Sequence, residues 1–104
     1  MGHTLLITGA TSGIGFEAAH RLAAMGHEVI LVGRNEEKLS RAVARIKEQV
    51  GHQQVHGFCA DLSQMREVRR LAERVCREVK KLDGLLNNAG ALYGARQETP
   101  EGIE

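Results

Sequence analysis

The stretch Thr8-Gly9-Ala10-Thr11-Ser12-Gly13-Ile14-Gly15 decides the expected fold of this 104-residue chain. It follows the apolar run Leu5-Leu6-Ile7 and precedes a helical pattern that starts near Ile14. A strand, a glycine-rich turn and a helix N-terminus in that order predict a phosphate-binding loop, because the first helical turn offers unpaired N–H groups and a partial positive charge. Glycines also let the backbone approach a pyrophosphate closely. The spacing G-x-x-x-G-x-G differs from the common G-x-G-x-x-G.

Apolar runs and helical periodicities alternate along the rest of the chain. Runs at residues 29–32, 55–60 and 85–86 predict three further strands, so the expected order is β-α-β-α-β-α-β. This order predicts an α/β protein with a Rossmann-like, doubly wound parallel sheet that has helices on both faces and ends after about the fourth strand. We expect residues 1–104 to form one incomplete domain. The fourth strand would lie at an open edge, which favours association, so a homo-oligomer stays an open alternative.

Local signals predict where the helices begin and end. Asn35 and Ser63 are expected to cap the second and third helices, and Gly26 and Gly51 are expected to end the first and second. The third helix carries an apolar stripe at helical spacing, formed by Met65, Val68, Leu71, Ala72, Val75, Cys76 and Val79.

Composition excludes several classes of function. The chain has 14 basic and 13 acidic residues, a balance that argues against a general nucleic-acid binder. No apolar run approaches the roughly 20 residues of a membrane-spanning helix. Cys59 and Cys76 form no Cys-x-x-Cys pair and are expected to be free, buried thiols in a reducing compartment, which points to the cytoplasm. The five histidines are scattered, so no metal site is expected.

Three motifs together resemble the short-chain dehydrogenase/reductase family. The opening stretch is similar to its T-G-x-x-x-G-I-G signature, and Asn87-Asn88-Ala89-Gly90 is similar to its N-N-A-G element. Asp61-Leu62 follows the third strand, where the family has an Asp followed by a small apolar residue. The resemblance runs from Thr4 onward. It implies an oxidoreductase that transfers hydride between a nicotinamide cofactor and an alcohol or carbonyl substrate.

The resemblance also implies roles for single residues. The Asp61 carboxylate would lie by the adenine amino group; its alternative role is that of a turn residue before Ser63. Asn87 would tie adjacent strands together. The remaining residues would surround the pyrophosphate, the adenine and the adenine-side ribose, and they are Gly9, Thr11, Ser12, Gly13, Ile14, Gly15, Leu62, Asn88, Ala89 and Gly90.

The residue just past the second strand selects the cofactor by charge. Arg34 occupies this place, and an arginine there pairs with the 2′-phosphate of NADP(H), whereas an acidic residue would favour NAD. Glu36 leaves NAD open, because it lies near the spacing of the acidic selector. Its alternative role is a first-turn helix residue.

The catalytic residues implied by the family do not fall within this chain. The chemistry needs a Ser and a Tyr-x-x-x-Lys pair, yet Tyr93 is the single tyrosine and Gln97 stands four residues after it. We therefore expect the N-terminal portion of a longer oxidoreductase, inactive alone. A non-catalytic dinucleotide-binding or interaction module is the alternative. Residues 98–104 resemble the retinol-dehydrogenase-like branch, which acts on lipophilic alcohols and carbonyls; an ordinary acidic loop is the other interpretation of this stretch.

Overall fold

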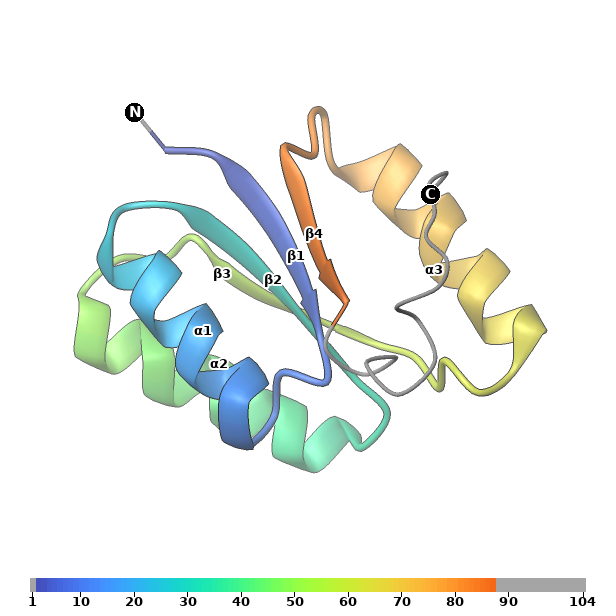
Figure 1. The fold of residues 1–104 in the computed structure, drawn as a ribbon, viewed down its shortest axis with the longest axis horizontal. Helices are drawn as coiled ribbons and strands as arrows, with labels where there is room; N and C mark the ends of the chain where they lie inside the picture. Colours follow the sequence, from blue (N-terminus) through green and yellow to red (C-terminus); the bar gives the residue numbers. More distant parts are fainter. Residues whose placement is uncertain (1, 88–104) are drawn as a thin grey trace.

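A computed structural model describes residues 2–87 of the chain. Four parallel strands form one sheet in the order β3-β2-β1-β4 (Figure 1). The element order confirms the predicted α/β class and Rossmann-like topology. The elements are β1 (Thr4–Thr8), α1 (Gly13–Ala24), β2 (Glu28–Gly33), α2 (Glu36–Val50), β3 (Val55–Cys59), α3 (Met65–Glu78) and β4 (Gly84–Asn87).

The helices lie on both faces of the sheet, as predicted. Helices α1 and α2 cover one face and α3 lies on the other (Figure 1). Successive strand side chains point to opposite faces, so each strand supplies both layers of the core. The α1–α2 side is built on Ile7, Val29, Leu31 and Val55, and the α3 side is built on Leu6, Ile30, Val32 and Phe58.

Three of the four predicted helix signals are correct. The Asn35 side chain accepts a hydrogen bond from the Lys38 N–H at 3.0 Å, and Gly51 ends α2 with a φ of 78°. Gly26 follows α1 with a φ of 95°. The prediction for Ser63 is wrong. Helix α3 begins one residue later than a Ser63 cap would require, with Gln64 at its N-cap, because the Ser63 hydroxyl donates to Asp61 Oδ1 at 2.7 Å.

Helix α3 packs more loosely than its periodicity suggested. None of its residues is buried, and Met65 is 72% exposed. Leu71 and Val75 pack partly against the sheet, and the Arg74 guanidinium lies 3.9 Å from the centre of the Phe58 ring. The apolar stripe is therefore only partly covered.

The prediction that the two cysteines are buried is also wrong. Both thiols are free, as expected, but both are exposed. Cys59 ends β3, an outer strand of the sheet, and its thiol donates to the Arg34 carbonyl at 3.5 Å. Cys76 lies on the side of α3 that lines a pocket.

Among the described residues, β4 is an outer strand of the sheet that pairs with β1 alone, as the sequence predicted. Leu85 and Leu86 are 57% and 45% exposed. Asp83 fixes the start of the strand: its N–H donates to the Thr4 carbonyl, and its Oδ2 accepts from the Thr4 N–H, each at 2.8 Å.

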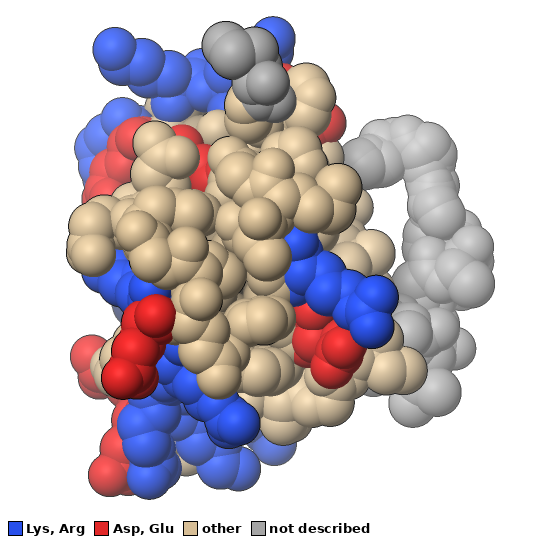
Figure 2. All heavy atoms as spheres, turned by 90° about the vertical axis from the view of Figure 1, so that its left-hand side faces the viewer, with Lys and Arg blue, Asp and Glu red and all other residues tan. Residues whose placement is uncertain are grey.

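The charged residues are mixed rather than segregated. Figure 2 shows one face of the molecule, on which acidic and basic side chains lie close together around an uncharged area. On this face the described residues form no extended basic surface of the kind that binds nucleic acid.

Candidate cofactor-binding site

The loop between β1 and α1 has the backbone of an anion-binding turn. Gly9 and Gly13 have φ values of 60° and 62°, a region that other residues rarely adopt. Ser12 is the N-cap of α1, but its side chain makes no capping hydrogen bond. The first turn of α1 is therefore not closed by its own cap, and an uncapped helix N-terminus is suited to bind phosphate.

Three loops meet where the strands end. Because all four strands are parallel, the loops after β1, β2 and β3 leave from the same edge of the sheet. The Ala10 N–H donates to the Val32 carbonyl at 3.4 Å, and the Ala60 N–H donates to the Gly33 carbonyl at 3.0 Å. This carboxyl edge is where open α/β sheets bind ligands.

A pocket of about 800 Å³ opens between this edge and α3. Its volume lies within the range of roughly 300–1,000 Å³ that is usual for ligand sites. The structure brings together five of the predicted site residues in its lining, namely Gly9, Thr11, Arg34, Asp61 and Leu62. Helix α3 adds an apolar wall that sequence reasoning did not assign to the site, formed by Val68, Leu71, Ala72, Val75 and Cys76.

The other predicted residues lie elsewhere. Ser12, Gly13, Ile14 and Gly15 belong to the loop and the first turn of α1, outside the pocket lining. Ile14 is 79% exposed, whereas Gly15 is buried. Asn88, Ala89 and Gly90 lie outside the described residues.

Asp61 performs the turn function that the sequence left as an alternative, and it also faces the pocket. Its Oδ1 accepts hydrogen bonds from the Ser63 hydroxyl and from the Ser63 N–H at 3.1 Å. The Ser63 hydroxyl bond is the main cause that lowers the pKa of the Asp61 carboxyl, and the Ser63 N–H and the Arg34 charge lower it further. Asp61 is therefore a carboxylate at neutral pH.

Arg34 and Glu36 occupy different environments. Arg34 is exposed and lines the pocket directly after β2. Glu36 is the first residue of α2 and belongs to its acidic first turn, the alternative role given above, and it does not line the pocket. Of the two charged side chains, the cationic Arg34 is the one that lines the pocket at the carboxyl edge of the sheet.

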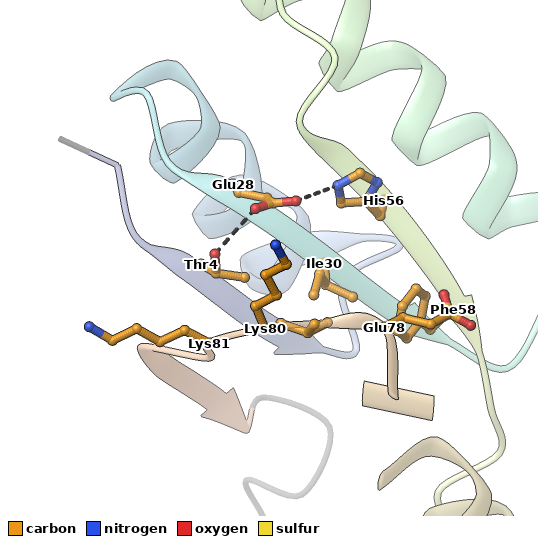
Figure 3. Close-up of a pocket in the computed structure, with 9 residues that line it drawn as sticks. Thr4, Glu28, Ile30, His56, Phe58, Glu78, Lys80 and Lys81 are labelled. Carbon is orange, nitrogen blue, oxygen red and sulfur yellow. Dashed lines mark hydrogen bonds and ion pairs between the residues drawn. The ribbon is translucent and has the colours of Figure 1, made fainter. Parts of the chain in front are cut away.

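A second pocket, of about 450 Å³, lies toward the other end of the strands (Figure 3). Glu28 links three strands there: its Oε1 accepts from the Thr4 hydroxyl at 3.2 Å, and its Oε2 lies 2.7 Å from His56 Nε2. The Lys80 side chain points toward Glu28, and Ile30 and Phe58 line the same pocket (Figure 3). The network lies at the amino ends of the strands, so we assign it to holding the sheet together.

Two kinds of site are not found in the described part of the chain. No group of three or more His, Cys, Asp or Glu residues is arranged to hold a metal ion. Within residues 2–87 no helix is both long enough and apolar enough to cross a lipid bilayer.

The topology and the glycine loop define a nucleotide-binding class of fold, and comparison with known proteins gives the family. The short chain dehydrogenase family model matches residues 3–102. The chain is 44% identical over 90 residues to the uncharacterized oxidoreductase YciK of Escherichia coli K12, covering 85% of this chain and 35% of that protein. It is 38% identical over 103 residues to mouse retinol dehydrogenase 12, covering 99% of this chain and 33% of that protein.

A solved structure shows the same relationship. The short chain dehydrogenase from Escherichia coli CFT073 complexed with NADPH matches with a TM-score of 0.76 and 42% identity, covering 83% of this chain and 36% of that one. This chain therefore belongs to the short-chain dehydrogenase family. It spans about a third of the length of the curated relatives it matches.

Proposed function

We propose that this chain is the NADP(H)-binding part of a short-chain oxidoreductase that transfers hydride between NADP(H) and an alcohol or carbonyl substrate. The observation that carries the proposal is the position of Arg34. Its side chain lines the same pocket as the glycine loop, at the edge of the sheet where α/β proteins bind nucleotides. The NADPH complex of a relative that is 42% identical supports the same cofactor.

The residues present fit a dinucleotide. Gly9 and Gly13 hold the loop in a backbone conformation that side chains disfavour, and they leave the first turn of α1 open to a pyrophosphate. The Arg34 guanidinium suits a 2′-phosphate, which it would bind through paired N–H donors. The Asp61 carboxylate suits the adenine amino group, with Leu62 beside the ring. Asn88, Ala89 and Gly90 remain assigned to the adenine-side ribose by family resemblance alone.

The bound cofactor would supply the hydride, and the described residues would hold and orient it. The Tyr-x-x-x-Lys pair that the family uses to move the substrate proton does not occur in residues 1–104. We therefore propose that the 104-residue chain alone binds the cofactor without catalysing hydride transfer. The likeness to a retinol dehydrogenase supports a lipophilic alcohol or carbonyl as the substrate class. The two free thiols fit a reducing compartment such as the cytoplasm.

Fluorescence titration tests this function. The purified chain is titrated against NADPH and, separately, against NADH, and circular dichroism verifies that it is folded. We expect saturable binding of both, with the tighter binding for NADPH. A folded chain that prefers NADH would remove Arg34 from its proposed role, and a folded chain that binds neither would overturn the proposal.

A further inference from the structure

Gly33 is the last residue of β2, and the space beside its Cα is filled by Thr11 from the β1–α1 loop. A Cβ atom on residue 33 would lie 2.7 Å from the Cγ2 methyl of Thr11, 3.8 Å from Leu39 Cδ1 and 3.9 Å from Thr11 Cβ. Ordinary contact between two carbon atoms needs about 3.5 Å or more. Any other residue at position 33 therefore requires Thr11 to move. Thr11 is a short, β-branched side chain with few alternative positions.

Space, and not backbone conformation, is the reason for a glycine at this position. The described glycines with positive φ are Gly9, Gly13, Gly26 and Gly51, and Gly33 is not among them. Gly33 pairs in parallel register with Cys59, and its carbonyl accepts the Ala60 N–H. The backbone at this position is thus ordinary strand, which any residue can adopt.

The contact joins two parts of the cofactor site. Thr11 belongs to the glycine loop, and Arg34 is the residue that follows Gly33. Both Gly33 and Thr11 line the 800 Å³ pocket together with Arg34. The Ala10 N–H bond to the Val32 carbonyl holds the loop against β2, and the approach of Thr11 to Gly33 limits how close the loop lies to the Arg34 backbone.

We propose that Gly33 is a positioning residue for NADP(H): it is the surface on which Thr11 rests, and it fixes the separation between the loop and Arg34. This inference rests on the proposed function, because the pyrophosphate and the 2′-phosphate belong to one molecule and must meet both groups at once. A methyl group at residue 33 would push Thr11 and its loop away from Arg34 without removing any side chain that is proposed to contact the cofactor.

A double-mutant cycle tests the contact. Gly33→Ala is expected to weaken NADPH binding by about tenfold, since a misplacement on the order of 1 Å has large effects on a preorganised site. Thr11→Ser removes the Cγ2 methyl and keeps the hydroxyl. In the Thr11→Ser background the same Gly33→Ala change is expected to weaken binding by less than about threefold, because the clash is gone. If Gly33→Ala weakened NADPH binding by the same factor with Thr11 present and with Thr11→Ser, the inference would be overturned.

Gly84→Ala is the matched control. Its new Cβ would lie 2.8 Å from a side-chain methyl, Leu5 Cδ2, but at the start of β4, away from the loop. NADPH binding is expected to stay within twofold of the unmutated chain. An equal loss in Gly84→Ala and Gly33→Ala would show a general effect on the fold and overturn the inference.

The same variants separate this inference from the proposed function. An unmutated chain that binds no NADPH overturns the proposed function, and the packing is then tested by urea unfolding. Gly33→Ala is expected to lower the urea midpoint, and the loss is expected to be smaller in the Thr11→Ser background. An unmutated chain that binds NADPH, with a Gly33→Ala variant that binds it equally well, overturns only the positioning role.

Discussion

The Thr8 hydroxyl donates a hydrogen bond to Asn87 Oδ1 at 3.1 Å across the β1–β4 pair. Thr8 is the first residue of the glycine-rich motif and Asn87 is the first residue of the N-N-A-G element. Two motifs that are 79 residues apart therefore meet at one side-chain contact. Thr8 is also the one polar residue buried in the described core. The contact aligns the ends of two neighbouring strands at the carboxyl edge of the sheet.

Thr8→Val keeps the shape of the side chain and removes this hydroxyl. We expect it to lower the free energy of unfolding by about 1 kcal/mol, the usual contribution of one hydrogen bond. Thr4→Val on the same strand is the control. It removes a 3.2 Å bond to Glu28, which keeps its contact with His56, so its cost should be smaller. Urea unfolding measures both, and a larger cost for Thr4→Val would contradict this view.

Arg34→Asp reverses the charge at the cofactor edge. We expect NADPH binding to weaken by about tenfold or more, because charge-assisted bonds to the 2′-phosphate are replaced by repulsion. NADH binding should stay the same or improve. Arg41→Asp places the same charge change on an exposed position of α2 and should not alter the ratio of the two affinities. An unchanged ratio in Arg34→Asp would remove Arg34 from cofactor selection.

Two arginines of α3, Arg74 and Arg70, separate the contribution of a contact with an aromatic ring to stability from that of an ion pair. Each arginine pairs with a glutamate of the same helix, Arg74 with Glu78 at 3.2 Å and the exposed Arg70 with Glu67 at 3.3 Å. Arg74 in addition covers the Phe58 ring at 3.9 Å. Arg74→Ala should lower the free energy of unfolding by about 1 kcal/mol, and Arg70→Ala should change it by less than about 0.5 kcal/mol. Thermal unfolding of both variants measures the difference. Equal losses would show that the Phe58 contact does not hold α3 to the sheet.

Protonation of Asp83 in acid should weaken the attachment of β4 to β1, because the Asp83 carboxylate accepts the Thr4 N–H. The Thr4 N–H bond is the main cause that lowers the pKa of the Asp83 carboxyl, and Lys81 and His3 lower it further. A lowered pKa in the folded state contributes stability that is present above the unfolded value, about 4, and is lost as the pH falls below it. Asp83→Asn removes this titration.

The measurement for Asp83 is urea unfolding between pH 6 and pH 2.5. The unmutated chain should lose stability more steeply than Asp83→Asn as the pH falls through this range. Parallel curves for the two proteins would show that the Asp83 carboxylate contributes nothing to the acid sensitivity of the fold.

The sequence predicts the sheet well because its signals are local. Residues 29–32 are apolar throughout, which is typical of a strand covered on both faces, and they lie at the centre of β2. The glycine loop and Asn35 depend on backbone conformation and on a contact three residues away. Such features need no knowledge of the tertiary structure.

The wrong predictions concern surfaces that meet only after folding. Helical spacing shows that Met65 and Cys76 share a face of α3, but not whether another layer covers that face. Ser63 is a good capping residue, yet Asp61 engages its hydroxyl first. Gly33 stands 22 residues from Thr11 in the chain, so the close approach appears only in three dimensions, although a glycine ending an apolar strand was a visible signal.

Calorimetric titration of the 104-residue chain with NADPH tests the central claim most directly. The chain is first shown to be folded by circular dichroism, and NADH is titrated under the same conditions. The proposed function predicts a saturable heat of binding with about one NADPH per chain, and a weaker affinity for NADH. A folded chain that gives no heat of binding and no NADPH-dependent rise in its unfolding temperature would contradict it.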